Sequence, residues 1–145
     1  MDARYRLAPM RDARAHEERV KQGDLAGEVG EAKALAVEVE GAVRRVEQVR
    51  GQLARATRSR GLALTRGVTV GALAGAERHL DRLRGELDAA LGALARAEAR
   101  HDGQLDAVAT ARARLGHARA ERALIERHFA TWRAARQKLA ERRED

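Results

Sequence analysis

Residues 80–97 read LDRLRGELDAALGALARA, and the spacing of the apolar residues in this stretch decides the fold. Two rows recur here at intervals of seven: Leu80, Leu87 and Leu94, and, three residues later, Leu83, Ala90 and Ala97. Alternating steps of three and four residues place both rows on one side of an α-helix, as in the apolar seam of a coiled coil. The stretch therefore predicts a helix whose seam packs on a second helix.

Both rows extend without a slip through the second half of the chain. The first row is Leu73, Leu80, Leu87, Leu94, His101, Val108, Leu115, Arg122, Phe129 and Arg136. The second row is Ala76, Leu83, Ala90, Ala97, Gln104, Ala111, Ala118, Ile125, Trp132 and Leu139. A pattern sustained over so many heptads predicts one helix over about 71–142. His101 lies on this seam, where a polar side chain helps to fix the register.

A shorter stripe with the same alternation occurs in the first half of the chain. Its members are Val29, Ala32, Ala36, Val39, Val43, Val46, Arg50 and Leu53, and it is widened by Leu35, Ala42 and Val49. The stripe predicts a helix over about 9–58, because Pro9 is tolerated in the first turn of a helix. Before Val29 the apolar residues Leu7, Met10, Ala13 and Val20 follow an offset stripe, which predicts a stutter near Gln22–Leu25.

A glycine-containing segment separates the two stripes. Gly61, Gly67 and Gly71 predict the end of one helix, a turn over about 59–70 and the start of the next helix. A turn centred near Thr65 makes residue i face residue ~130 − i across the hairpin, and helix one then runs out of partners near Ile125.

We therefore expect an all-α fold in a single domain over residues 1–145. It is a long antiparallel two-helix coiled-coil hairpin whose second helix is longer and overhangs the first.

The composition argues against catalysis. The chain has no Cys and a single Ser, Ser59, which lies in no nucleophile elbow. No pair of its five His has the i, i+4 spacing of a helical metal site with a third ligand nearby, and phosphate-binding and dinucleotide-binding glycine motifs are absent. We expect no enzymatic activity, no catalytic or metal-binding residue and no cofactor.

The sequence also lacks the marks of membrane insertion and secretion. No apolar run approaches the ~18 residues that a membrane span needs. No apolar segment of a signal peptide follows the N-terminus. We expect a cytoplasmic protein.

Positive charge is concentrated in the middle of the chain. The net charge is +7. Residues 50–70 contribute five arginines and no acid: Arg50, Arg55, Arg58, Arg60 and Arg66. Three interpretations are open: ordinary solvated arginines, a docking site for an acidic protein, or contact with nucleic acid phosphates. The last is disfavoured because the segment has no aromatic residue on which bases would stack.

The few aromatic residues are expected to meet at one end of the hairpin. Tyr5 is near the N-terminus, and Phe129 and Trp132 are near the C-terminus. An antiparallel hairpin brings these segments together. Either the N-terminal segment folds back onto helix two, or the cluster forms an apolar, arginine-rimmed plug for another protein, since Trp, Tyr and Arg are favoured interface anchors.

Both terminal segments resemble one protein family. Residues 5–14 read YRLAPMRDAR and are followed by Glu17 and Glu18. This resembles the start of FliJ/YscO proteins, which tend to read aromatic-x-Leu-x-Pro-Leu-Leu-x-Leu-Arg before a charged helix. Residues 132–145, WRAARQKLAERRED, are similar to the C-terminal helix of that family.

The resemblance implies a role in type III protein export, flagellar or injectisome. Family members look like the central coiled coil of a rotary ATPase. They insert into the hexameric secretion ATPase and couple it to the export gate, so that the chain would be peripheral to the membrane export apparatus and touch the membrane only indirectly. Secretion chaperones are further implied partners, and no small-molecule substrate is implied.

Carried onto this chain, the resemblance implies two contact sites. The paired termini would enter the ATPase through Tyr5, Leu7, Met10, Phe129, Trp132, Arg136 and Leu139. The opposite end would face the gate through Val49, Leu53, Arg55, Arg58, Leu73 and Leu80. The alternatives from the residues alone are a generic coiled-coil scaffold or adaptor, or a basic protein associated with nucleic acid.

Overall fold

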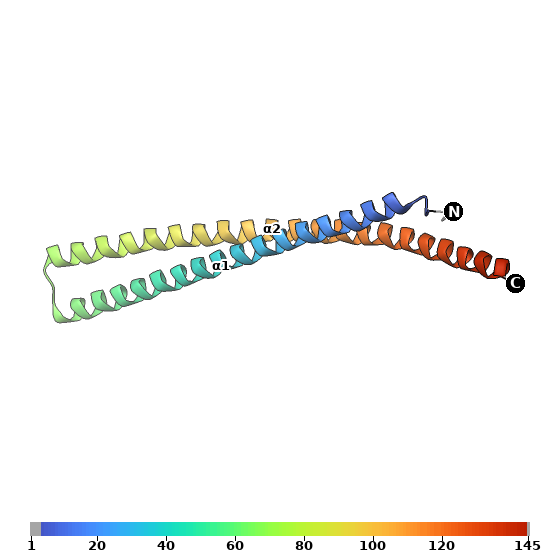
Figure 1. Cartoon of the computed structure of the whole chain (residues 1–145). Helices are drawn as coiled ribbons and strands as arrows, with labels where there is room; N and C mark the ends of the chain where they lie inside the picture. Colours follow the sequence, from blue (N-terminus) through green and yellow to red (C-terminus); the bar gives the residue numbers. More distant parts are fainter. Residues whose placement is uncertain (1–3, 145) are drawn as a thin grey trace. The chain divides into compact units, whose positions relative to one another are not determined.

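Two long helices make up nearly all of the computed structural model, which describes residues 4–144 (Figure 1). Helix α1 spans Ala8–Arg66, with 59 residues, and helix α2 spans Val70–Glu144, with 75 residues. No strand occurs among the described residues. The antiparallel hairpin with a longer second helix is therefore confirmed.

The turn is shorter and later than the glycines suggested. Helix α1 continues past its expected end at about 58 to Arg66, because a helical Gly61 costs only about 1 kcal/mol relative to alanine. Gly67 alone has a positive φ, 83°, and ends the helix in the left-handed conformation that glycine adopts most easily. The Thr69 hydroxyl then accepts a hydrogen bond from the N–H of Ala72 at 3.1 Å, which caps the start of α2.

Tertiary contacts divide the chain into two compact units, each containing a segment of both helices. Unit 1 combines residues 1–30 with 105–145, and unit 2 is the continuous segment 31–104, which includes the turn. The contacts thus form two clusters, and the single domain expected over residues 1–145 stays a prediction.

The core of unit 2 lies along the predicted seam of α2. Leu80, Leu83, Ala90 and Ala97 are all buried, as the heptad rows predicted. On α1 the residues turned away from solvent are Ala32, Leu35, Val39, Ala42, Val46, Val49, Leu53, Ala56, Arg60 and Ala63. Seven members of this row were predicted: Ala32, Val39, Val46 and Leu53 from the stripe, and Leu35, Ala42 and Val49 from the positions expected to widen it. Two predicted members lie outside it, because Val43 is 37% exposed and Arg50 is exposed as well.

In unit 1 the seam of α1 is charged. The heptad steps continue backwards from Ala32 through Glu28, Leu25, Lys21, Glu18, Arg14 and Arg11, all half-buried. Met10 and Val20, by contrast, are 47% and 44% exposed. The predicted stutter near Gln22–Leu25 was wrong, because the heptad steps run through Leu25 without a slip, with charged residues at most of the other seam positions.

The pairing of the helices also differs from the predicted register. In unit 2, Arg60 forms an ion pair with Glu77 and Arg100 with Glu38. The expected facing residues were 70 for Arg60 and 92 for Glu38. The turn lies at residues 67–69 and not at Thr65, and a displacement of the turn moves the pairing by twice as much.

The overhang of α2 starts later than Ile125. In unit 1, Tyr5 contacts α2 as far as Trp132. Beyond it, most residues up to Glu144 are exposed. Because the chain before Ala8 also packs on α2, the N-terminal segment covers more of α2 than helix one alone would.

One leucine of unit 2 lies in the seam and another is exposed, so replacing each by alanine should change the free energy of unfolding by very different amounts. Leu80 is 1% exposed and Leu62 is 57% exposed. Leu80→Ala should lower the free energy of unfolding by about 3 kcal/mol through lost burial and a residual cavity. Leu62→Ala should change it by less than about 0.5 kcal/mol. Urea unfolding followed by circular dichroism measures both, and equal effects would contradict the seam described here.

Candidate protein-contact surfaces

An aromatic cluster holds the N-terminal segment against α2 in unit 1. The Tyr5 ring lies edge-on to Phe129, with centroids 5.0 Å apart, and 5.1 Å from the Trp132 ring. Phe129 and Trp132 stack at 5.8 Å. Tyr5 is 8% exposed, and its hydroxyl is hydrogen-bonded to Nδ1 of His128 at 2.7 Å. Of the two interpretations left open by the sequence, fold-back of the N-terminal segment is the arrangement present.

Arginines cover the faces of two of these rings. The guanidinium carbon of Arg11 lies 3.9 Å from the centre of the Phe129 ring, and that of Arg136 lies 5.5 Å from the centre of Trp132. Such cation–π contacts are favourable because a cation is attracted to the negative face of the ring. The cluster is thus capped by positive charge.

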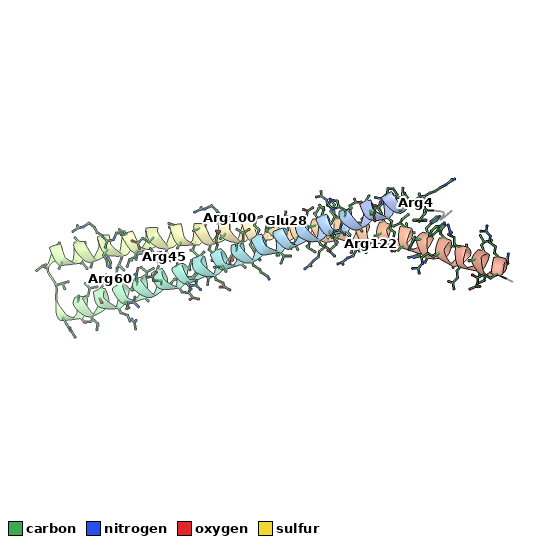
Figure 2. The ribbon with its side chains drawn as sticks, viewed as in Figure 1. Arg4, Glu28, Arg45, Arg60, Arg100 and Arg122 are labelled. Carbon is green, nitrogen blue, oxygen red and sulfur yellow. The ribbon has the colours of Figure 1, made fainter. Side chains whose placement is uncertain are left out.

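Ion pairs between the helices occupy the charged seam of unit 1. Arg11 pairs with Glu126 at 2.8 Å, and Arg14 pairs with Glu121. Glu18, whose side chain is 12% exposed, receives Arg122 at 2.9 Å (Arg122 is labelled in Figure 2). The facing row of α2 remains apolar, with Leu115, Ala118 and Ile125 buried. The ion pairs formed beside that row restrict the register to the one that matches opposite charges.

The Arg11–Glu126 pair changes the acid–base behaviour of both partners. The hydrogen bond from Arg11 lowers the pKa of Glu126 below its ordinary value of 4.5. The same bond raises the pKa of Arg11. About a third of each side chain is exposed, so the pair is partly screened by water.

The residues predicted to contact an ATPase all belong to unit 1 but differ in accessibility. Tyr5 is buried, and Leu7, Phe129, Trp132 and Arg136 are half-buried. Met10 and Leu139 are 47% and 55% exposed. Leu7, Met10, Leu124 and Ile125 also line an open hollow of about 300 Å³. The accessible apolar surface of unit 1 therefore centres on Met10, Leu124 and Leu139.

The residues predicted to contact an export gate belong to unit 2, and most of them are part of the seam. Val49 and Leu80 are 0% and 1% exposed, so they hold the helices together and are closed to a partner. Leu53 and Leu73 are half-buried. Arg55 and Arg58 are exposed, and of the six they are the ones on the surface.

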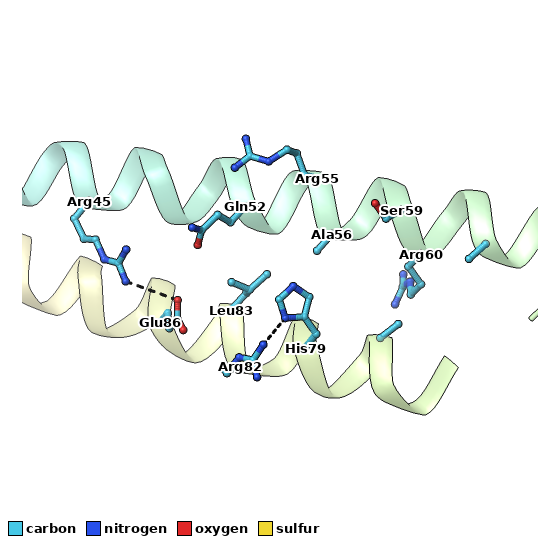
Figure 3. Close-up of a pocket in the computed structure, with 12 residues that line it drawn as sticks. Arg45, Gln52, Arg55, Ala56, Ser59, Arg60, His79, Arg82, Leu83 and Glu86 are labelled. Carbon is cyan, nitrogen blue, oxygen red and sulfur yellow. Dashed lines mark hydrogen bonds and ion pairs between the residues drawn. The ribbon is translucent and has the colours of Figure 1, made fainter. Parts of the chain in front are cut away.

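A basic groove lies between the helices of unit 2, on the turn side of Arg45 (Figure 3). Its volume is about 780 Å³. The charged and imidazole groups that line it are Arg45, Arg55, Arg60, His79, Arg82 and Glu86. Arg45 pairs with Glu86 at 3.8 Å, and Arg60 pairs with Glu77. The Arg60 Nε is buried without a hydrogen-bond partner in the described structure.

Sequence reasoning missed the part of this groove that α2 contributes. His79 and Arg82 lie opposite the arginines of α1 only because the turn falls at Gly67. The opposite charges of Arg60 and Glu77, which pair across the two helices, could have indicated the correct register. The expected turn centre at Thr65 placed these two residues apart, so their pairing was not recognised.

The end of the hairpin exposes four large aliphatic side chains that the sequence reasoning also passed over. Leu62 and Leu64 are 57% and 51% exposed, and Val68 and Val70 are 41% and 86% exposed. Leu62 and Leu64 lie in the last turns of α1, Val68 lies between the helices, and Val70 begins α2. We call residues 58–70 the tip.

Residues 4–144 contain neither a metal-ligand cluster nor a membrane-spanning segment. Among residues 4–144, no group of three or more His, Asp or Glu could hold a metal ion. Within the same range, neither helix has a window apolar enough to cross a membrane.

The fold is shared with a solved bacterial structure. CT670 from Chlamydia trachomatis, described as a proposed YscO homologue, matches with a TM-score of 0.85 over 98% of this chain and 88% of the other, at 14% sequence identity. No protein-family model matches the sequence, and no curated protein is significantly similar to it. At this identity the likeness establishes the fold, and that fold is the one the terminal motifs implied.

The single tryptophan reports on the aromatic cluster. Tyr5→Ala should shift the emission of Trp132 to longer wavelength and raise its quenching by acrylamide, because the Tyr5 ring that covers it is removed. Tyr5→Phe keeps the ring and should retain the wild-type emission. An unchanged spectrum in Tyr5→Ala would show that the N-terminal segment does not pack there in solution.

The Arg11–Glu126 pair predicts a defined pH dependence. A carboxylate whose pKa is lowered by folding stabilises the folded state above its ordinary pKa, and this contribution is lost as the pH falls through the lower, folded value. Wild type should therefore melt at a higher temperature than Glu126→Gln at pH 7. The difference should shrink as the pH falls below 4.5 and vanish only once the pH is below the lowered pKa of Glu126. Glu40→Gln, at an exposed position of unit 2, is the control and should follow wild type throughout.

Proposed function

We propose that this chain is the central stalk component of a type III protein export apparatus, flagellar or injectisome. The observation that carries the proposal is the match of the whole hairpin to a structure described as a proposed YscO homologue. The terminal segments that resemble FliJ/YscO proteins add an independent argument, because they meet in one unit.

In this proposal unit 1 enters the pore of the hexameric secretion ATPase. Of the residues implied by the family resemblance, Met10 and Leu139 are exposed and apolar, and Arg136 is half-buried on α2. The paired aromatic residues act indirectly, because they fix the N-terminal segment that carries Met10. Unit 1 is asymmetric, because α1 forms one side of it and α2 forms the other. Subunits around the pore therefore meet different side chains, and such differential contact is required to bias their nucleotide states.

The hairpin end of unit 2 is proposed to contact the export gate. Of the residues implied by the family resemblance, Arg55 and Arg58 are exposed and can make this contact. The seam residues Val49 and Leu80 act by keeping the two helices together. Secretion chaperones remain candidate partners of the same exposed surface.

A specific observation favours a second candidate, a self-associating scaffold. The hollow lined by Leu7, Met10, Leu124 and Ile125 is apolar and open, and Leu124 is 63% exposed. A second copy of the chain could cover it. Sedimentation distinguishes the two functions: a scaffold forms oligomers that increase with concentration and dissociate in Leu124→Ser, whereas a stalk stays monomeric.

The stalk function predicts an effect on a purified hexameric secretion ATPase from the same organism. Saturating chain should increase hexamer formation and ATP turnover. Met10→Asp combined with Leu139→Asp should reduce the stimulation at least about tenfold, because two apolar contacts are replaced by charges that would be desolvated. Val37→Asp combined with Leu91→Asp alters two exposed apolar residues of unit 2 and is the matched control.

The control pair should stimulate as wild type does. If saturating wild-type chain changed neither hexamer formation nor turnover, the proposal would be wrong. Equal losses in both double variants would assign the effect to general surface hydrophobicity and would likewise count against a specific contact through unit 1.

A further inference from the structure

The tip combines exposed apolar side chains with positive charge. Leu62, Leu64, Val68 and Val70 are each between 41% and 86% exposed. A cluster of aliphatic residues this accessible at the end of a hairpin calls for an apolar environment beyond the chain itself. The backbone gives no reason for it, because Gly67 and the Thr69 cap already complete the turn.

These side chains surround the tip and do not form one face. Leu62 and Leu64 are two residues apart on α1, and at about 100° per residue they point to nearly opposite sides of the helix. Val68 and Val70 lie on either side of Thr69, beyond the end of α1. A single docked helix or a flat protein surface covers one side. A fluid layer into which the tip inserts covers all of them.

The positive charge of the tip indicates which kind of fluid layer it enters. No Asp or Glu occurs between Glu47 and Glu77. Arg58 and Arg66 are exposed, one on each side of Leu62 in the sequence, and the apolar stems of arginine can lie along an apolar phase while the guanidinium stays at its surface. Arg55 and Arg82 add positive charge in the neighbouring groove. This pattern is complementary to a surface that is apolar inside and negatively charged outside.

We infer that the tip inserts shallowly into the surface of an anionic phospholipid bilayer. Leu62, Leu64, Val68 and Val70 enter the boundary between headgroups and acyl chains, and Arg58 and Arg66 contact the phosphates. Neither helix is apolar enough to cross the bilayer, so the contact stays at the interface. The inference depends on the tip alone and holds whether or not the chain serves an export ATPase.

Vesicle flotation tests the contact with the full chain. The probes are vesicles of phosphatidylcholine alone and of phosphatidylcholine mixed with phosphatidylglycerol. Wild type should float with the anionic vesicles and not with the neutral ones. Leu62→Ser combined with Val70→Ser should reduce the partition coefficient at least about tenfold, because two aliphatic side chains no longer leave water. Val37→Ser combined with Leu105→Ser, at positions 61% and 47% exposed, is the matched control and should bind as wild type does.

A second pair of variants tests the electrostatic part at equal net charge. Arg58→Gln combined with Arg66→Gln should weaken binding by about fivefold per arginine, as expected for basic residues at an anionic surface. Arg112→Gln combined with Arg114→Gln removes the same charge from exposed positions of unit 1 and should have a small effect. Circular dichroism checks that every variant keeps the wild-type helicity.

A fluorescent label locates the inserted residue directly. The chain has no cysteine, so Val68→Cys and Val37→Cys each accept a single environment-sensitive fluorophore. Emission from position 68 should shift to shorter wavelength on anionic vesicles, and emission from position 37 should not.

Three outcomes would overturn the inference. The first is no flotation with anionic vesicles at low salt. The second is equal flotation of the tip and control variants, which would reduce the binding to net charge. The third is binding of poly-L-glutamate that is lost in the tip variants while vesicle binding is absent or unchanged, which would make an acidic protein the partner.

Discussion

The side-by-side packing of one narrow row of side chains from each helix is the constraint on which this chain depends. In unit 2 that row is apolar, with Leu80 and Val49 fully enclosed. A hairpin of two helices buries only this one row, and most other residues remain in contact with water. Consequently the features that distinguish one part of residues 4–144 from another are differences in side-chain exposure and charge at the surface.

The row of α1 residues that faces α2 differs in residue type between the two units. Apolar side chains fill it in unit 2, whereas Arg11, Arg14 and Glu18 occupy it in unit 1 and pair with acids and bases of α2. An aliphatic seam contributes stability with little preference for register. Charged pairs contribute less stability because of screening and desolvation, but a shifted register would leave each charge unpaired. Unit 1 thus combines ion pairs and the rings around Tyr5 with a row of buried aliphatic residues on α2, which are Val108, Ala111, Leu115, Ala118 and Ile125.

The parts of the fold and of the candidate surfaces that could be predicted are those that leave a regular pattern in the sequence. Leucine and alanine spacing predicted α2 and its buried face, because burial of apolar residues is what that spacing produces. Apolar spacing failed in unit 1, where Met10 and Val20 lie outside the seam and charged residues fill it. The turn was misplaced because Gly61 is helical and only Gly67 takes the positive φ. The aromatic end was predicted from topology, since an antiparallel hairpin must bring Tyr5 near Trp132. The basic groove and the exposed tip depended on the register and therefore could not be placed.

The uninterrupted heptad phase of α1, from Arg11 to Ala63, limits how such a chain can change in length. Removing one residue from the middle of α1 would rotate every following side chain by about 100° and turn its seam away from α2. Removing a whole heptad from α1 alone would keep the phase but set each ion pair of unit 1 against the wrong partner. The changes that preserve both are matched gains or losses of seven residues in the two helices. In this fold the two helices must therefore gain or lose residues together and in steps of seven, because a change of a single residue disrupts the seam.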